Sequence, residues 1–381
     1  MKKDIHTELN LEHAVHYHEG MFPPSALDYG ALMPALLRAT DALARYDQEL
    51  ESLHNPEFFL APLQSQEAVL SSRMEGTIST IDEILEYDAT QEELGGNIEN
   101  VRPDIIETIL YRRTLSFAQK EMADGRPLGN SLLKSMHQML LSMGRGARKS
   151  PGEYKKEQNY IGEMRTRNVG YIPISPEKLL TGMEQLFQYI SESQHPALIQ
   201  TGFGHVEFES LHPFKDGNGR IGRMLITLTL WSSGVISSPN FYISRFMEAN
   251  KEEYIERMRA VSAEGDWTGW ALFFLKAIEE QAQYNLETTR EIRTLYENMK
   301  QIFSDISGSK NAITLLDAVF TNPVFRNQQI AEHSGISAAT VNRFTKSLYE
   351  SDLDLLKIVR EGAGRRSAIY AFEPLLEIVR S

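Results

Sequence analysis

The stretch from residue 211 to residue 223 constrains this chain more than any other. Its sequence is Leu-His-Pro-Phe-Lys-Asp-Gly-Asn-Gly-Arg-Ile-Gly-Arg. Pro213 disfavours the helical conformation for the residue before it, so we expect His212 to lie on a loop. Four residues after this histidine, Asp216 supplies a carboxylate that can bind a hard cation through oxygen. The stretch therefore brings a base and a cation ligand close together.

The glycines of the same stretch predict a binding site for an anion. Gly217, Asn218 and Gly219 can adopt positive φ angles and turn successive N–H groups toward one point. The apolar residues that follow have helical spacing and predict a buried helix face: Ile221, Met224, Leu225 and Leu228. The glycines would then lie at a helix N-terminus, which favours phosphate. Arg220 and Arg223, three residues apart, could contact the same phosphate.

These residue types together indicate a site for phosphoryl or nucleotidyl transfer, because they supply a base, a cation ligand, a phosphate site and two arginines. The alternative is a glycine-rich turn before a core helix, with the histidine on the surface. A lone Gly-x-Gly would favour that alternative. The order of residue types over the twelve positions from His212 to Arg223 favours the transfer site.

The composition limits the kinds of protein that this chain can be. Its 381 residues suffice for two or three domains, and 41% hydrophobic with 24% charged residues is an ordinary globular balance. A formal net charge of −13 argues against a surface that binds nucleic acid throughout. The lack of cysteine excludes disulfides, thiolate metal sites and cysteine nucleophiles. With no secretory signal and no apolar run of about 18 residues, we expect a cytoplasmic protein without membrane contact.

The residues from His212 to Arg223 resemble the signature of the Fic family at every position. That signature is His-Pro-Phe-x-Asp/Glu-Gly-Asn-Gly-Arg-x-x-Arg. The resemblance implies a mainly α fold, namely a Fic helical bundle with a small β-hairpin flap. It also implies a protein adenylyltransferase, which moves AMP from ATP to a Ser, Thr or Tyr hydroxyl of a target protein.

The resemblance further implies roles for individual residues. His212 would be the general base, Phe214 would pack under the loop, and Asp216 would bind a Mg²⁺ ion that bridges the α and β phosphates of ATP. Tyr242 and Asn250 are candidates for the adenine and ribose, although helix surface and core explain them nearly as well. The residues assigned to ATP are Lys215, Asp216, Gly217, Asn218, Gly219, Arg220, Ile221, Gly222, Arg223, Tyr242 and Asn250.

Two local helix signals lie near residue 75. The pattern from Ser65 to Glu75 predicts a helix, and Gly76 suits the position just past a helix C-terminus. The sequence Thr-Ile-Asp-Glu from Thr80 to Glu83 has the form of a capping box. We therefore expect one helix, a tight turn at Gly76 and the start of a second helix.

The segment around this turn resembles an inhibitory motif. Ser71 to Gly76 resembles the Ser/Thr-x-x-x-Glu-Gly/Asn motif of Fic proteins. The resemblance implies that Ser71 and Glu75 are regulatory and that Glu75 pairs with Arg223. Such a pair would take the arginine away from the ATP γ-phosphate and repel that phosphate. On side-chain chemistry alone, Ser71 and Glu75 would be solvated polar groups of a helix.

Residues 159–173 predict a hairpin beside the reactive loop. Strand character begins at 150–154 and continues through 159–162 and 169–173, with polar residues between the last two runs. In Fic proteins the matching region is the flap, whose edge strand binds a target segment by main-chain hydrogen bonds. The resemblance therefore implies a target protein docked along 159–173, and a plain surface hairpin is the alternative.

The C-terminal part has a different pattern and indicates a separate domain. Residues 304–310 are rich in serine and glycine and predict a linker. The elements predicted beyond it are helices at 313–320 and 327–333, a third helix capped by Ser337, and strands at 355–360 and 367–372. Three helices followed by a hairpin with a basic tip resemble a winged-helix domain.

The partner of this domain stays open. Arg343 and Lys346 on the third helix, with Arg365 and Arg366 at the hairpin tip, could bind DNA phosphates across 326–366. Positive and negative charges nearly balance from residue 321 onward, whereas a DNA-binding domain usually has a clear excess of Lys and Arg. Contact with another protein, or formation of a homodimer, is equally open.

The predicted organisation has three regions. These are an N-terminal helical region at 1–115 with the inhibitory helix, a catalytic core at 116–303 and the winged-helix domain at 311–381. Two other functions stay open: transfer of another phosphate-containing group, and a nucleotide-sensing regulator that binds DNA. The sequence does not determine the target protein, whether inhibition acts within one chain or between two, or whether the site also removes AMP.

Overall fold

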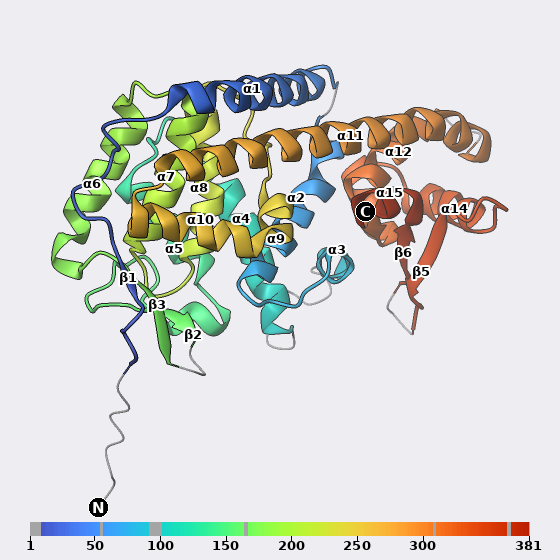
Figure 1. Cartoon of the computed structure of the whole chain (residues 1–381). Coiled ribbons are helices and arrows are strands. Elements are labelled where there is room, and N and C mark those ends of the chain that lie inside the picture. Colours follow the sequence, from blue (N-terminus) through green and yellow to red (C-terminus); the bar gives the residue numbers. More distant parts are fainter. Residues whose placement is uncertain are drawn as a thin grey trace, which may run out of the picture. The chain divides into compact units, whose positions relative to one another are not determined.

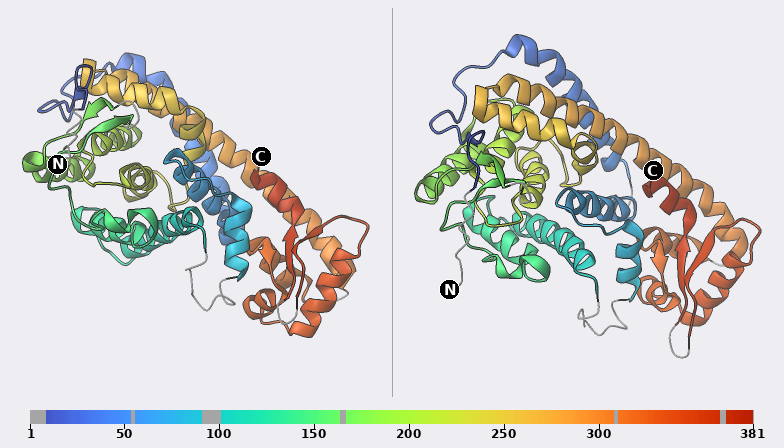
Figure 2. Two further views of the ribbon diagram at one scale, coloured as in Figure 1. Left: turned by 90° about the horizontal axis from the view of Figure 1, so that it is seen from below. Right: turned by 60° about the horizontal axis from the view of Figure 1, so that its bottom comes forward.

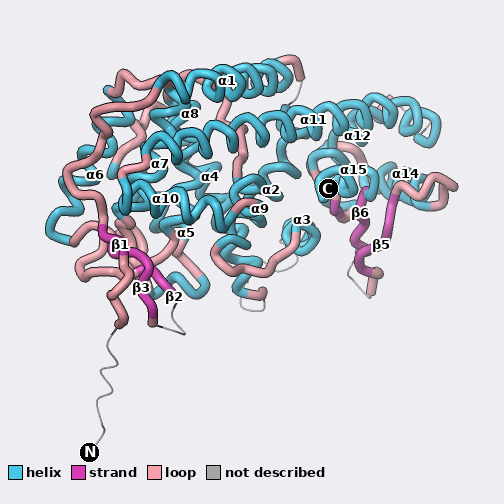
Figure 3. The backbone as a smooth tube through the Cα atoms, viewed as in Figure 1, coloured by secondary structure: helices cyan, strands magenta, loops and turns pink. Residues whose placement is uncertain are grey.

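The described part of the chain folds mainly into helices, with two small three-stranded sheets (Figure 1 and Figure 3). The computed structural model describes residues 9–53, 56–90, 101–163, 167–307, 310–363 and 367–380. The mainly α fold predicted from the sequence is therefore confirmed. Within these residues, no helix combines the length and the apolar character that a membrane span needs.

The chain divides into two compact units. The first comprises Met1–Leu43, Arg113–Pro239 and Phe246–Glu280. The second comprises Ala44–Arg112, Asn240–Arg245 and Gln281–Ser381. Each unit thus combines three separate stretches of the chain, and the domain limits expected from the sequence stay a prediction.

The first unit contains the helices around the predicted site. Its helices include α5 (Asn130–Leu140), α6 (Pro176–Glu192), α7 (Ala197–Leu211), α8 (Asn218–Ser232) and α10 (Lys251–Glu264), with the 3-10 turn η1 (Gly144–Arg148). It shares α1 (Tyr29–Glu51), α4 (Pro103–Ala123), α9 (Ser244–Ala249) and α11 (Trp267–Ser307) with the second unit. α7 packs against α6 and α8 and is almost completely buried, including its polar residues Gln200, His205 and Glu207. Gly222 lets α8 approach α7 closely, because a Cβ there would lie 2.2 Å from the Glu209 carboxylate.

A small sheet in the first unit contains the predicted hairpin. Its strand order is β1 (Val15–His16), β3 (Asn168–Ile172) and β2 (Ile161–Glu163) (Figure 1). β3 is antiparallel to β2 and parallel to β1, so the hairpin expected within 159–173 is confirmed. Residues 150–154 form a turn and coil rather than a strand, because Ser150 and Gly152 have positive φ angles. The sequence pattern does not predict β1, since a strand of two residues shows no alternation.

Hydrogen bonds anchor the residues after β1 to α7 and α10. The buried ring of His18 has Nε2 2.8 Å from Glu207 on α7 and Nδ1 2.7 Å from the Ser262 hydroxyl on α10. The Tyr17 hydroxyl donates to Glu207 at 2.6 Å. Burial, together with the Glu207 carboxylate, raises the pKa of Tyr17 far above its ordinary value. Tyr171 of β3 also lies 3.0 Å from the Ser262 hydroxyl, so this network ties the sheet to the helices.

The second unit contains the predicted regulatory segment and the C-terminal elements. Its N-terminal helices include α2 (Pro56–Met74) and α3 (Ile81–Thr90). The C-terminal elements are α12 (Ala312–Thr321), β4 (Val324–Phe325), α13 (Asn327–Ser334), α14 (Ala338–Tyr349), β5 (Leu356–Arg360), β6 (Ile369–Phe372) and α15 (Glu373–Arg380). The strand order is β4-β6-β5, and the β5–β6 hairpin is the red pair of strands in Figure 2. Ser337 accepts a hydrogen bond from the Thr340 N–H, so the predicted helix cap is confirmed.

The C-terminal part also departs from the prediction. α11 continues to Ser307, so residues 304–307 are helical, which makes the predicted linker wrong over these positions. Neither β4 nor α15 was expected, although Leu375, Leu376 and Val379 of α15 are fully buried. Arg365 and Arg366, at the predicted basic tip, lie outside the described residues. The winged-helix assignment stays a prediction.

Candidate functional site

His212 ends α7 in an uncommon backbone conformation. It is the C-cap residue, with φ of 45° and ψ of 61° in the left-handed region, and Pro213 follows it. The predicted loop position of His212 is therefore confirmed. A residue other than glycine in this region costs about 1–2 kcal/mol, so its surroundings must hold it there. The His212 side chain is half-buried.

Asn218 closes the loop that follows His212. Its Oδ1 accepts from the Phe214 N–H and its Nδ2 donates to the Phe214 carbonyl, both at 2.9 Å. Gly217 is the N-cap of α8 with φ of 78°, whereas Asn218 and Gly219 lie in the first turn of α8 without positive φ. The predicted positive φ angles hold only for Gly217. The arrangement is a helix N-terminus, whose first amides have no acceptor within the helix, rather than a nest of three residues.

His137 of α5 supports the loop. Its ring stacks on Phe214 with centroids 3.7 Å apart, and neither side chain is exposed. The Gly152 N–H donates to Nδ1 at 2.8 Å, so Nε2 carries the proton and donates to the Asp216 carbonyl at 3.0 Å. Burial lowers the pKa of His137 to about 4, which keeps the ring neutral at pH 7. The expected packing of Phe214 is thus confirmed.

Lys155 and Asn159, from the segment before β2, contact the same loop. The buried Lys155 donates from Nζ to the Leu211 carbonyl at 3.0 Å and from its backbone N–H to the Pro213 carbonyl at 2.8 Å. Asn159 donates from Nδ2 to the His212 carbonyl at 3.2 Å. The sequence singles out neither residue, because their partners are backbone carbonyls that lie more than 50 positions further along the chain.

The predicted phosphate and cation ligands lie at the start of α8. Arg220 Nη2 is 3.5 Å from Oδ1 of Asp216, and the Asp216 side chain is 40% exposed. Lys215 is exposed and lies 3.9 Å from Glu157. Arg220 itself is buried, so its charge lies inside the protein beside the more accessible carboxylate of Asp216.

Arg223 lies one turn further along α8 than Arg220, near enough to His205 of α7 to affect its pKa. Arg223 and Ile221 are buried. Burial, followed by the charge of Arg223, lowers the pKa of His205 to about 3. The His205 ring has Nδ1 3.1 Å from the Gly222 carbonyl and Nε2 2.8 Å from the Tyr254 hydroxyl. A neutral histidine therefore packs beside the second arginine of the signature.

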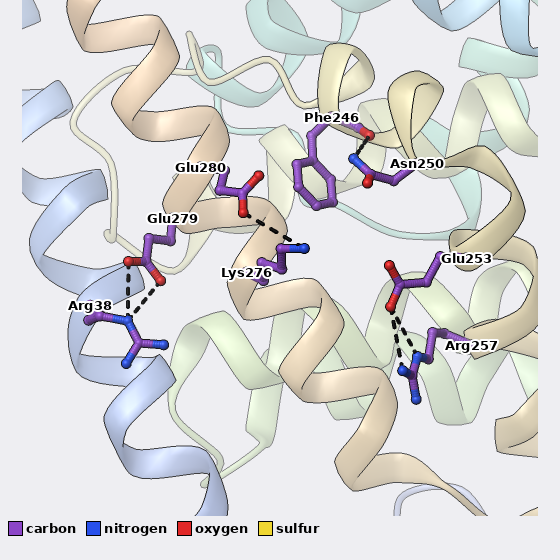
Figure 4. A network of polar contacts seen from close by, with 8 residues as sticks. All are labelled: Arg38, Phe246, Asn250, Glu253, Arg257, Lys276, Glu279 and Glu280. Carbon is purple, nitrogen blue, oxygen red and sulfur yellow. Dashed lines mark hydrogen bonds and ion pairs between the residues drawn. The ribbon is translucent and has the colours of Figure 1, made fainter.

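The two candidates for the adenine and ribose have different surroundings. Asn250 is the N-cap residue of α10 and donates from Nδ2 to the Phe246 carbonyl at 2.9 Å, as Figure 4 shows. Figure 4 also shows the Glu253–Arg257 pair one turn further along α10. Tyr242 belongs to the second unit, is buried, and lies with its hydroxyl 3.3 Å from Oδ1 of Asn240. Their assignment to ATP stays a prediction.

The predicted regulatory segment ends α2 in a regular C-cap. The Thr77 N–H donates to the Ser72 carbonyl at 3.2 Å and the Gly76 N–H donates to the Arg73 carbonyl at 2.9 Å. Together with φ of 86° at Gly76, these bonds form a Schellman motif, so the predicted helix end is confirmed. Glu75 is the C-cap residue of this motif, and Ser71 is buried on the last turn of α2. Glu75 belongs to the second unit and Arg223 to the first, and their pairing stays a prediction.

The start of α3 follows the predicted capping box. The Thr80 N–H donates to the Glu83 carboxylate at 2.9 Å, and the Glu83 N–H lies 3.3 Å from the Thr80 hydroxyl. Both reciprocal bonds of the motif are present. The backbone around Glu75 is therefore fixed on one side by a helix end and on the other by a helix start.

Two family models match consecutive parts of this chain, and curated proteins match it as well. The Fic/DOC family N-terminal model matches residues 33–120, and the Fic/DOC family model matches residues 127–230. A Fido domain-containing protein of Dictyostelium discoideum is 33% identical over 112 residues, which are 29% of this chain and 71% of that protein. A protein adenylyltransferase Fic of Aedes aegypti is 26% identical over 145 residues, which are 37% of this chain and only 26% of that protein. The chain therefore spans about a quarter of the length of that adenylyltransferase.

A solved structure has the same fold over most of the chain. The crystal structure of a Fic family protein from Desulfovibrio desulfuricans G20 covers 90% of this chain and 95% of its own, with a TM-score of 0.54 and 17% identity. At that identity the likeness concerns the fold alone. Together with the family models, the complete signature and the α7–α8 turn, these findings show that the chain belongs to the Fic/DOC family.

Proposed function

We propose that the chain is a protein adenylyltransferase that moves AMP from ATP to a Ser, Thr or Tyr hydroxyl of a target protein. The observation that carries the proposal is the α7–α8 turn, in which one short loop joins His212, Asp216 and the N-terminus of α8. Relatives named as adenylyltransferases support the same chemistry at low identity.

In the proposed reaction His212 is the general base. An imidazole with an ordinary pKa of about 6.5 is largely neutral at pH 7 and can accept a proton. His212 would take the proton of the target hydroxyl as the hydroxyl oxygen attacks the α-phosphorus of ATP. The bond from that phosphorus to the bridging oxygen then breaks, and pyrophosphate leaves. Arg220 and the first amides of α8 would stabilise the charge on the phosphates.

Asp216 fits the role of a Mg²⁺ ligand. Its carboxylate is 40% exposed beside the start of α8, and Mg²⁺ at nucleotide sites is usually held by one or two carboxylates and the substrate phosphates. The described residues contain no cluster of three or more His, Asp or Glu side chains that could hold a metal, so this assignment depends on Asp216. When bound, Mg²⁺ would neutralise phosphate charge and orient the triphosphate.

The small sheet supports a docking place for the target. β3 has a partner on each side, so β2 is an edge strand of the sheet. An edge strand offers unpaired main-chain groups to an extended peptide, which gives affinity that does not depend on side chains. We assign the target segment to β2, at residues 161–163 within the predicted 159–173.

Glu75 is assigned as the inhibitor of this reaction. Its carboxylate would pair with Arg223 and repel the γ-phosphate of ATP, leaving His212 unchanged. The Schellman motif supports this assignment, since it fixes the backbone of Glu75 at the end of α2.

The test of the proposed activity is His212→Ala. We expect label from α-labelled ATP to disappear from protein, a loss of at least about 100-fold, while the affinity for ATP measured by calorimetry changes less than about twofold. Transfer at the wild-type rate would remove His212 from the mechanism. If the wild type and all variants bind ATP but none transfers label, a nucleotide-sensing regulator or a different phosphate-containing donor would be favoured instead.

A further inference from the structure

We propose that Lys155 and Asn159 are positioning residues that hold His212 in place for proton transfer, an inference that rests on the adenylyl transfer proposed above. Both precede β2 and lie outside the signature, and Asn159 is the first residue of the predicted flap region 159–173. Neither belongs to the residues assigned to catalysis, to ATP or to regulation, and the target segment is assigned to β2 at residues 161–163.

The two residues donate hydrogen bonds to the carbonyl groups of His212 and of the residues on both sides of it. Nζ of Lys155 donates to Leu211 at 3.0 Å, and its backbone N–H donates to Pro213 at 2.8 Å. Nδ2 of Asn159 donates to His212 at 3.2 Å and to Phe214 at 3.1 Å. The carbonyls of four consecutive residues, from Leu211 to Phe214, therefore accept hydrogen bonds from these two residues.

Lys155 and Asn159 also hold each other. Nζ of Lys155 donates to Oδ1 of Asn159 at 2.8 Å, which leaves the Asn159 amide to face the loop. This bond fixes the orientation of the amide, because a flipped Asn159 would bring two donors together. The pair therefore acts as one unit, and a change in either residue disturbs the contacts of the other.

The charge and burial of Lys155 suit the end of a helix. Lys155 is only 3% exposed, and Leu211 is the last residue of α7. The last carbonyls of a helix lack donor partners within it and carry a partial negative charge, so an ammonium group there is favourable. Burial nevertheless lowers the pKa of Lys155 to about 7. Burying a charged lysine costs free energy, and an apolar residue could fill the same space without that cost. The lysine is therefore better explained by its hydrogen bonds to the loop than by packing alone.

The strained backbone of His212 explains why the loop needs the hydrogen bonds from Lys155 and Asn159. The residue is left-handed with φ of 45°, and such conformations persist only where the surroundings enforce them. Pro213 has no N–H, so the loop has one donor fewer with which to hold itself. The carbonyl contacts of Lys155 and Asn159 supply the constraint. The imidazole is attached to the strained Cα, so releasing the carbonyls would let the base move.

The experiment compares three variants in the Glu75→Gly background. Asn159→Asp keeps the size of the side chain and the acceptor for Lys155 but removes the donor to His212 and Phe214. Lys155→Met removes the donor to Leu211. Lys156→Met is the matched control, because the neighbouring Lys156 is 80% exposed and pairs with Glu153 on the surface. The first readout is kcat and KM for ATP; the second is the NMR signal of the His212 ring, identified by its loss in His212→Ala.

We expect Asn159→Asp and Lys155→Met to lower kcat about 10- to 100-fold while KM for ATP stays within about twofold, because the base is misplaced and the nucleotide contacts are kept. The ring signal of His212 should shift or broaden in both variants and stay unchanged in Lys156→Met. Wild-type kcat in both variants, or a rise in KM with unchanged kcat, would overturn the proposal.

The second readout separates this proposal from the proposed activity. If the Glu75→Gly protein transfers no AMP, the proposed adenylyl transfer is wrong. The NMR signal of the His212 ring still decides whether Lys155 and Asn159 position His212. An unchanged signal in both variants would overturn the positioning role. If Lys155→Met does not fold, as judged by near-UV circular dichroism, Asn159→Asp carries the test.

Discussion

The carboxylate of Glu67 accepts two hydrogen bonds from Ser244, one from the N–H at 3.0 Å and one from the hydroxyl at 2.6 Å. It also accepts a hydrogen bond from the Tyr111 hydroxyl at 2.8 Å. Glu67 is 4% exposed and lies two turns before Glu75 on α2. A buried carboxylate with three donors thus fixes the rotation of the helix that ends at the proposed inhibitory residue.

Glu67→Ala is expected to destabilise the protein by about 3 kcal/mol. The change leaves the Ser244 N–H, the Ser244 hydroxyl and the Tyr111 hydroxyl buried without this acceptor, and such groups cost about 1–3 kcal/mol each before relaxation. Urea unfolding followed by circular dichroism would measure the loss. Glu67→Gln, which keeps one acceptor oxygen, should lose less. Equal stability of Glu67→Ala and wild type would show that these bonds contribute little.

Gly76→Ala tests the C-cap of α2. With φ of 86°, Gly76 has a conformation that costs an L-residue about 1 kcal/mol, and an added Cβ would meet no atom within 4 Å. The strain should loosen Glu75 and raise AMP transfer, by less than Glu75→Gly does. Gly20→Ala is the matched control, because Gly20 has φ of 78° and equally open surroundings. If labelling rises equally in Gly76→Ala and Gly20→Ala, or rises in neither, the C-cap of α2 has no specific effect on inhibition.

Burial of His137 predicts a loss of stability in mild acid. Its pKa in the folded protein is about 4, against an ordinary value of 6.5, so between these values the unfolded chain binds more protons. The free energy of unfolding therefore falls as the pH falls through that range, by about 2 kcal/mol between pH 7 and pH 5 for this one group. His205, with a pKa of about 3, acts in the same direction.

The pH prediction is measured by Tm at several pH values. His137→Gln cannot be protonated in this range, so its Tm should fall less steeply from pH 7 to pH 5 than that of the wild type. Its Tm at pH 7 reports separately on the lost stacking with Phe214. Parallel pH profiles of the two proteins would show that His137 is not the group responsible.

The sequence predicts the parts of the fold that depend on local signals. Gly76 with its Schellman motif, the capping box at Thr80 and Glu83, the Ser337 cap and the apolar face of α8 all depend on residues a few positions apart. The strands β1 and β4 have two residues each and are too short to show alternation. The helix α15 was not predicted, although its buried residues Leu375, Leu376 and Val379 have helical spacing. The linker at 304–310 was predicted from its serine and glycine composition alone. That composition did not prevent α11 from continuing to Ser307.

The candidate site follows the same division. His212, Asp216 and the start of α8 are contiguous, so the signature predicts their proximity. The positive φ angles expected at Asn218 and Gly219 are absent because α8 begins at Asn218, whose side chain closes the loop instead. His137, Lys155 and Asn159 contact the loop through backbone carbonyls or ring stacking, and no pattern in their own neighbourhood reveals these partners.

The most direct measurement of the central claim compares wild type with Glu75→Gly in α-labelled ATP and Mg²⁺ and records label on protein. We expect label to rise severalfold or more in Glu75→Gly, because the γ-phosphate would no longer be repelled. The double variant Glu75→Gly with His212→Ala should carry no label. Equal labelling of wild type and Glu75→Gly would contradict the inhibitory role of Glu75, and label that survives in the double variant would contradict catalysis by His212.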